Sequence, residues 1–122
     1  MRELQILVDL GHHPFIVRLY EVHRVAGACH LVFECMEEAL DQAILRARAA
    51  PHRHLPHTTT LLHQLLQAVA YVHDKGWMHR DIKPSNILLQ GHLAKLADFS
   101  LARKLRTGSR LRTTYVSTRW YR

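Results

Sequence analysis

The sequence predicts an α+β domain in which amphipathic helices pack with two short β-hairpins. Two observations carry this prediction. Apolar residues recur at helical spacing in three separate segments, and two pairs of apolar runs are each joined by a short turn that contains glycine. With 122 residues, 48% of them hydrophobic, the chain is long enough to build one domain with a core.

The N-terminal third predicts a helix and then a hairpin. Leu4, Leu7 and Val8 fall at i, i+3 and i+4, and Gly11 follows Leu10 as a C-cap. A strand, a turn and a second strand are then expected at residues 15–25, 26–28 and 30–35.

The middle of the chain predicts two more helices. Leu40, Ala43, Ile44 and Ala47 mark a short one that stops before Pro51. A longer helix is expected at residues 60–73, with Thr58–Thr60 as an N-cap cluster, Lys75-Gly76 as its end and its apolar stripe in the core. The stripe comprises Leu61, Leu62, Leu65, Leu66, Val69, Ala70 and Val72.

The last third predicts a polar loop at residues 79–86 and a second small hairpin. Its strands are expected at residues 87–89 and 93–97, joined by Gln90-Gly91-His92. Residues 105–122 are rich in Thr, Ser and Arg, have no clear period and predict a loop.

Composition narrows the classes of partner and compartment. The net charge is +7, but the arginines are dispersed and form no basic stripe between aromatic residues, which disfavours nucleic-acid binding. An acidic protein substrate, or a phosphate carried by the chain itself, explains the arginines equally well. No apolar run approaches the roughly 20 residues of a membrane span, and no secretory signal is apparent. We therefore expect an intracellular protein, in the cytoplasm, the nucleus or both.

Two minor alternatives concern cysteine and histidine. Cys29 and Cys35 are expected to be reduced core thiols, with a disulfide as the less favoured alternative. His52, His54 and His57 form an H-x-H-x-x-H pattern that invites a zinc site, but no Cys or carboxylate lies beside it in sequence, and loop histidines are usually solvated.

The most informative stretch is the loop from His79 to Asn86. It reads H-R-D-x-x-x-x-N and is followed by Asp98-Phe99-Ser100, in the order that a protein kinase catalytic loop and its D-F-G motif require. Each polar type has its own chemistry there: Asp81 can accept a proton from a substrate hydroxyl, and Lys83 can contact a transferring phosphoryl group. Asn86 and Asp98 can hold Mg²⁺.

The chain resembles a eukaryotic Ser/Thr protein kinase of the group that contains cyclin-dependent, MAP and male-germ-cell-associated kinases. Three features beyond the loop carry the resemblance, which covers nearly all of the chain. Met1-Arg2-Glu3-Leu4 is similar to the group's regulatory helix, Thr113-Thr114-Tyr115 to its T-x-Y activation motif, and Ser117–Arg122 to its S-T-R-W-Y-R segment. The branch near the germ-cell-associated and MOK kinases fits best.

The resemblance implies a partial kinase fold and a position for ATP and Mg²⁺. Residues 1–36 would form a remnant of the N-lobe with the hinge, and residues 37–122 the C-lobe up to the end of the activation segment. Asp81 would be the base, Lys83 a phosphate contact, and Asn86 and Asp98 the metal ligands. The remaining ATP-site positions would be Glu3 as partner of a phosphate-binding lysine, Phe33 as gatekeeper, Glu34 and Met36 in the hinge, and Leu88 as pocket floor.

The resemblance also implies regulation by phosphorylation. Arg2, Arg80 and Arg103 would converge on a phosphate carried by Thr113, and an upstream activating kinase would act on Thr113 and Tyr115. Thr118 would hydrogen-bond near the catalytic loop. A cyclin-like regulator is a further partner that the group suggests, beside a protein substrate with Ser or Thr.

Two departures from the group's pattern limit these expectations. Ser100 stands where the group has glycine, which would restrict φ > 0 at that position and alter regulation while leaving Asp98 intact. The sequence also has no G-x-G-x-x-G and no lysine before Lys75, so the phosphate-covering loop and the partner of Glu3 are missing from these residues.

The leading hypothesis is therefore a fragment or truncated form of a protein Ser/Thr kinase that is inactive alone. The alternative is a catalytically dead binding module, or a decoy that competes for a regulator or substrate of a complete kinase. Intact Asp81, Asn86 and Asp98 argue against the alternative.

Overall fold

The computed structural model describes residues 2–50 and 55–105, with Arg2 described by its backbone alone. Helices and small antiparallel sheets are both present and do not alternate regularly, so the predicted α+β class is confirmed. In chain order they are α1 (Arg2–Leu10), β1 (Leu19–Val25), β2 (Ala28–Phe33), β3 (Glu38–Ala39), α2 (Leu40–Ala49), α3 (Thr58–Asp74), β4 (Trp77–Met78), the 3₁₀ turn η1 (Pro84–Asn86), β5 (Ile87–Gln90), β6 (Leu93–Leu96) and β7 (Arg103–Lys104).

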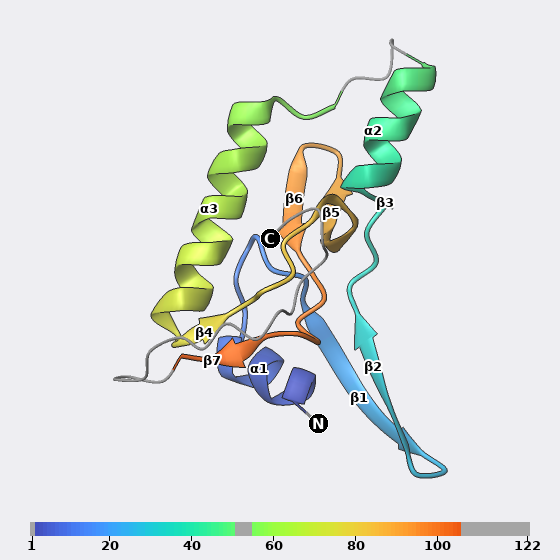
Figure 1. Cartoon of the computed structure of the whole chain (residues 1–122). Coiled ribbons are helices and arrows are strands. Elements are labelled where there is room, and N and C mark those ends of the chain that lie inside the picture. The colour runs from blue at the N-terminus through green and yellow to red at the C-terminus, as the bar shows by residue number, and fades with distance from the viewer. Residues whose placement is uncertain (1, 51–54, 106–122) are drawn as a thin grey trace.

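Three small sheets organise the chain (Figure 1). The antiparallel β1–β2 hairpin projects from one end beside α1, whereas the β3–β5–β6 sheet lies between α2 and α3 at the other end. The two-residue strands β4 and β7 pair between these regions, close to α1. Segments that are far apart in sequence, such as residues 10–17 and 94–97, are thereby brought together.

Helix α1 has the predicted extent but presents a different face to the core. Gly11 ends it with φ +62°, and the Gly11 N–H donates to the carbonyl of Leu7 at 3.2 Å. The buried side chains are Ile6, Leu7 and Leu10, whereas Val8 is 63% exposed. The sequence offers two overlapping apolar faces, and packing against α3 and β6 selects one of them.

The first hairpin confirms the predicted turn and corrects both strand boundaries. Ala26 and Gly27 both have positive φ, +49° and +81°, as a two-residue type I′ turn requires. The first strand begins at Leu19 rather than Phe15, and the second runs over Ala28–Phe33 rather than residues 30–35.

The late start of β1 has a structural cause. Residues 15–17 pair with the end of β6 instead of with β2. Leu96 N–H donates to the carbonyl of Phe15 at 2.9 Å, and Val17 N–H donates to the carbonyl of Leu96 at 2.9 Å. The backbone groups that a longer hairpin would use are therefore engaged by a strand 80 residues further along the chain.

Helix α2 matches its prediction, whereas α3 departs from its own in two ways. The N-cap of α3 is His57, without a side-chain hydrogen bond, so the three threonines occupy the first turn instead of capping it. The stripe is also only partly core: Val72 is buried, but Leu62 is 51% and Leu66 is 66% exposed, and the buried Ala68 lies outside the predicted stripe. The end is as predicted, because Lys75 is the C-cap and Gly76 has φ +75°.

Two hydrophobic clusters form the core, and α3 contributes to both. The larger cluster contains buried residues of α1, α3, β4, β6 and the segment after it: Ile6, Leu7, Leu10, Ile16, Ala68, Val72, Trp77, Leu96, Phe99 and Ala102. The smaller cluster joins α2 to the β5–β6 hairpin, with Leu61 and Leu65 of α3 packed against it. The second hairpin is thus held on both sides, close to its predicted boundaries.

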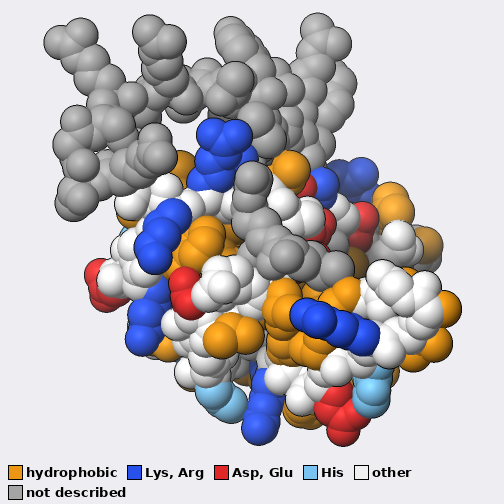
Figure 2. All heavy atoms as spheres, turned by 90° about the horizontal axis from the view of Figure 1, so that it is seen from below, with side chains coloured by type: hydrophobic (Ala, Val, Ile, Leu, Met, Phe, Trp, Pro, Cys, Tyr) orange, Lys and Arg blue, Asp and Glu red, His pale blue; other side chains and the backbone are white. Residues whose placement is uncertain are grey.

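The surface carries scattered charge and several exposed apolar side chains. On the face in Figure 2, Lys and Arg side chains lie singly between apolar ones. The two cysteines are free, and Cys35 is exposed, which corrects its predicted place in the core. Within residues 2–50 and 55–105, no helix combines the length and apolar character needed to cross a bilayer.

Candidate active site

The H-R-D loop leaves β4 and is held by the imidazole of His79, which is only 2% exposed. His79 Nε2 lies 2.9 Å from the carbonyl of Ala97, and the Asp81 N–H donates to His79 Nδ1 at 3.2 Å. This pair of bonds requires a neutral ring with its proton on Nε2. Burial lowers the pKa of His79, although the bond to Ala97 and the nearby carboxylates act in the opposite direction.

Asp81 stands at the centre of the loop and is 4% exposed. Lys83 Nζ donates to Asp81 Oδ2 at 2.7 Å, and Asn86 Nδ2 donates to the same oxygen at 3.0 Å. Asn86 Nδ2 also donates to the carbonyl of Asp81 at 2.9 Å. Charge-assisted bonds of this kind fix the carboxylate in one orientation. The structure therefore brings together the three residues that the motif predicted.

The Asp98-Phe99-Ser100 motif is joined to the catalytic loop by a hydrogen bond to the backbone of Asn86. The 3₁₀ turn η1 ends at Asn86, and the Ala97 N–H donates to the Asn86 carbonyl at 2.9 Å, immediately before Asp98. Since Asn86 uses its Nδ2 for Asp81, its Oδ1 remains without a hydrogen bond among the described residues. Asp98 has φ +60°, the left-handed conformation, and is exposed.

Glu3 lies in the first turn of α1, close enough to Asp98 for their charges to interact. Partial burial raises the pKa of Glu3, and the negative charge of Asp98 raises it further. Within the described part of the chain, no Lys or Arg forms an ion pair with Glu3. Phe99 is fully buried in the larger cluster and meets the edge of His79 at a centroid distance of 4.8 Å. Leu7 lies in the same cluster, and Leu19 packs against it.

Ser100, which stands where the group has glycine, does not adopt the positive φ that was expected at that position. Among the described residues, those outside glycine with positive φ are Ala26, Arg80 and Asp98, so Ser100 carries no such strain. Its hydroxyl donates to Asp98 Oδ1 at 2.6 Å, and its N–H donates to the same oxygen at 3.2 Å. The left-handed residue of the motif is the aspartate, and the serine supports it.

The segment that follows β2, where the sequence predicted a hinge, is fixed by an ion pair that sequence reasoning missed. Lys95 of β6 is 8% exposed, and its Nζ lies 2.7 Å from both carboxylate oxygens of Glu34. Glu34 Oε1 also accepts the N–H of Arg18 at 2.6 Å. Burial by itself would raise the pKa of Glu34, but the bonds from Lys95 and Arg18 outweigh it and lower the pKa. The available signal was a lysine inside the apolar run Leu93–Ala97, because buried charges are normally paired.

Of the other predicted adenine-site residues, Leu88 is linked to this pair by strand pairing, and Phe33 and Met36 lie near Glu34 in sequence. Phe33 ends β2 and packs partly buried against the larger cluster. Leu88 is the cross-strand partner of Lys95, so the two side chains share one face of the sheet. Met36 is half-buried in the connection from β2 to β3. The structure brings Phe33, Glu34 and Leu88 to one region around Lys95, while their proposed contacts with adenine stay predictions.

The predicted regulatory residues are described only in part. Arg80 has φ +71°, and its Nε donates to the carbonyl of Leu101 at 2.9 Å. Arg103 in β7 pairs with Met78 of β4, two residues before Arg80 in sequence. The side chain of Arg2 and the residues Thr113, Tyr115 and Thr118 lie outside the described residues, as do His52 and His54.

The donor set suits a hard divalent cation. Asp98 offers a carboxylate oxygen, Oδ2, that no described residue occupies, and Asn86 offers its amide oxygen; Mg²⁺ prefers oxygen ligands of this type. No group of three or more His, Cys, Asp and Glu within the described ranges could hold a metal ion. Any cation here would thus be held by few protein ligands, as is usual for Mg²⁺ bound together with phosphates.

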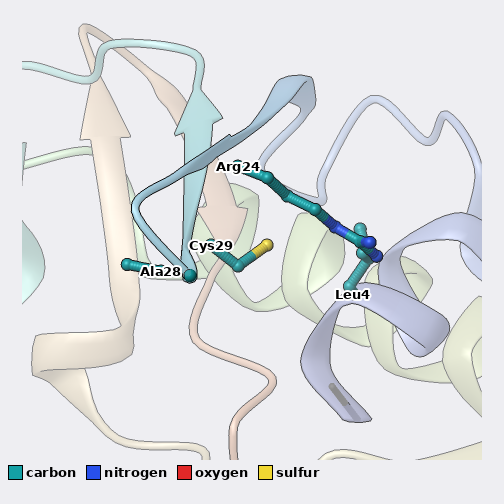
Figure 3. A pocket seen from close by; sticks show the side chains of 5 residues that line it. Leu4, Arg24, Ala28 and Cys29 are labelled. Atoms are coloured by element: carbon teal, nitrogen blue, oxygen red, sulfur yellow. The ribbon is translucent and has the colours of Figure 1, made fainter.

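A separate pocket of about 370 Å³ lies between α1 and the tip of the first hairpin. Figure 3 shows the side chains of Arg24 and Cys29 extending from the hairpin toward Leu4 of α1. None of the H-R-D or D-F-S residues lines it. We place the functional site at the catalytic loop because the buried, oriented polar groups gather there.

Comparison with known proteins agrees with this site. The protein kinase domain family matches residues 1–122. Mitogen-activated protein kinase 15 of Xenopus laevis is 42% identical over 129 residues, covering 99% of this chain and 22% of that protein. Serine/threonine-protein kinase ICK of Mus musculus is 42% identical over 124 residues, covering 100% of this chain and 19% of that protein. Cyclin-dependent kinase F-4 of Oryza sativa subsp. japonica is 41% identical over 122 residues, covering 100% of this chain and 26% of that protein.

The chain thus spans about a fifth to a quarter of the length of these curated relatives. Its helix, hairpin and small sheets fit a partial kinase fold, as the resemblance implied. The chain therefore belongs to the protein kinase domain family, in the group of cyclin-dependent, mitogen-activated and male-germ-cell-associated kinases.

Proposed function

We propose that these residues serve the transfer of the γ-phosphoryl group of Mg-ATP to Ser or Thr hydroxyls of proteins. The observation that carries the proposal is the buried Asp81–Lys83–Asn86 network and the backbone bond that sets Asp98 beside it. Phosphoryl transfer needs little covalent chemistry from a protein, so positioning and charge neutralisation dominate. The network supplies both.

Each residue has a distinct role in the proposed reaction. Asp81 Oδ2 orients the substrate hydroxyl and accepts its proton, and its carboxylate is held for this task by Asn86. Lys83, which lies on the same oxygen, contacts the transferring phosphoryl group when substrate separates the two side chains. Bound Mg²⁺, held by Asn86 and Asp98, would neutralise charge on the phosphate oxygens.

The adenine end of the nucleotide belongs to the hinge. Phe33 closes the back of this region, backbone groups of Glu34 and Met36 bind the base, and Leu88 lies beneath it. The Lys95–Glu34 pair supports the assignment, because it ties the hinge to the strand that leads into Asp98. ATP in this position would extend from the hinge toward the metal ligands.

We infer that the 122 residues alone do not catalyse phosphoryl transfer. They contain neither a glycine-rich loop to cover the phosphates nor a lysine to pair with Glu3, whose pKa is raised by burial and by Asp98. Protein substrates, an upstream kinase acting on Thr113 and Tyr115, a cyclin-like regulator and an intracellular location are parts of the same proposal.

A pair of assays tests the proposal. The chain alone should not phosphorylate a basic protein in the presence of Mg-ATP. The same residues grafted into the kinase domain of mouse ICK, in place of the segment that they match, should phosphorylate Ser and Thr, and Asp81→Asn in the graft should reduce the rate at least 10³-fold, the order expected when a member of such a catalytic unit is lost. A correctly folded graft without activity would refute the proposal and favour the non-catalytic binding module.

A further inference from the structure

The Ser100 side chain makes a contact with Asp98 that a glycine could not make. Its hydroxyl and its N–H both donate to Asp98 Oδ1, at 2.6 and 3.2 Å. A carboxylate has about four lone-pair sites on its two oxygens, so these two donors fill those of Oδ1. Oδ2 is left without a hydrogen bond from any described residue.

The backbone of Asp98 explains why this support matters. Its φ of +60° lies in the left-handed region, which costs an ordinary residue about 1–2 kcal/mol and which Asp tolerates through local hydrogen bonds. Two donors from Ser100 anchor the side chain across a single intervening residue, Phe99, which is itself buried. These donors therefore engage Oδ1 and leave Oδ2 as the oxygen that no described residue occupies.

We propose that Ser100 is a positioning residue that presents a single oxygen of Asp98 to a divalent cation and thereby favours Mg²⁺ over Ca²⁺. The proposal rests on the proposed function, which assigns Asp98 as a metal ligand. Mg²⁺ requires near-octahedral geometry and keeps several waters, whereas Ca²⁺ takes 6–8 oxygens and accepts bidentate carboxylates. A carboxylate with one engaged oxygen suits the smaller ion, and the hydroxyl bond to Oδ1 must break before bidentate binding.

Metal binding to the ICK graft described above, loaded with a non-hydrolysable ATP analogue whose phosphates complete the ligands of the cation, tests the proposal. Free Mn²⁺, quantified by electron paramagnetic resonance, serves as the probe, and Mg²⁺ and Ca²⁺ are titrated as competitors. Removing a hydrogen bond that a neighbouring group makes to a metal-binding side chain typically weakens metal affinity about 10–100-fold. Because the Ser100 N–H bond survives in Ser100→Ala, we expect a smaller effect, with Mg²⁺ bound about 3–10-fold more weakly. Ca²⁺ should weaken less, so the preference for Mg²⁺ falls. Ser100→Thr retains the hydroxyl and should behave as the wild type does.

The outcomes separate this proposal from the function on which it rests. If the wild type shows no binding that Asp98→Asn removes, both assignments fail. If Asp98→Asn removes binding but Ser100→Ala binds Mg²⁺ equally well or more tightly, only the role of Ser100 is overturned, and the tighter case would show that the hydroxyl competes with the cation. Circular dichroism checks the fold of each variant, and Ser100 is exposed, so no core packing is removed.

Discussion

The Lys95–Glu34 pair gives the sharpest test of how the segment that follows β2 is held against β6. Lys95→Met keeps the length and apolar stem of the side chain but leaves Glu34 as an unpaired, buried carboxylate. Breaking a buried pair by removing one partner costs about 3–5 kcal/mol. Because the two side chains retain 10% and 13% exposure, we take the lower end, about 3 kcal/mol. With a urea m-value of about 2 kcal/mol/M, the unfolding midpoint should fall by about 1.5 M.

The assay is urea unfolding of the chain followed by circular dichroism, arranged as a double-mutant cycle. Glu34→Gln keeps an acceptor for the Arg18 N–H and removes the charge, and the double variant removes both charges. If the pair is coupled, the double variant should be more stable than the sum of the single losses predicts, by at least about 1 kcal/mol. Lys104→Met, at an exposed lysine whose Nζ lies over the face of Trp77, is the control and should lose less than about 1 kcal/mol.

The effect of pH supplies an independent check. The folded pKa of Glu34 is lowered from 4.5, so its carboxylate contributes stability above that pH and loses the contribution as pH falls through the folded pKa. The wild type and Lys95→Met should therefore converge in stability in strong acid. A Lys95→Met protein within about 0.5 kcal/mol of the wild type at pH 7, or strictly additive losses in the cycle, would refute the reasoning.

Three further predictions follow from single contacts. Burial lowers the pKa of His79 below 6.5, so the unfolded state binds more protons just below that value; stability should fall as pH drops through 6.5, and a urea titration across pH 5–7 should show this slope weakened in His79→Gln. Tyr71 donates its hydroxyl to the carbonyl of Leu10 at 2.5 Å and stacks on His13, so Tyr71→Phe should lower the free energy of unfolding by about 1 kcal/mol while the stacking persists; an unchanged thermal midpoint would contradict the role of that bond. Leu66 is 66% exposed on α3, so Leu66→Glu should change stability by less than about 0.5 kcal/mol and raise solubility, measured by sedimentation of concentrated protein, whereas Val72→Glu at a buried position of the same helix should unfold it.

The catalytic loop was predictable because its chemistry is local. The spacing of His79, Asp81, Asn86 and Asp98 can be read without any knowledge of the fold, and each residue type has a separate chemical use. The turns that position the loop are also local. Gly76 and the 3₁₀ turn at Pro84 depend on residues within a few positions of themselves.

The face that each helix buries was less predictable. Both α1 and α3 carry more apolar positions than one face needs, so periodicity alone gave Val8, Leu62 and Leu66 as core residues. The structure exposes all three, since the choice of face depends on what lies opposite. The same limit explains why the two-residue strands β4 and β7 were missed: each exists only through pairing with a distant partner.

The sequence by itself determined a kinase-type loop, the order of its motifs and an α+β class, because all three follow from local spacing and patterning. Tertiary structure alone decided how the loop is held. His79 reaches the carbonyl of Ala97 across 18 residues, Lys95 reaches Glu34 across 61 residues, and Tyr71 reaches Leu10 across the same separation. The physical reason is that the contribution of a charge or hydroxyl to stability depends on how buried it is and on which groups it contacts. Both depend on the surrounding fold and not on the residue type alone.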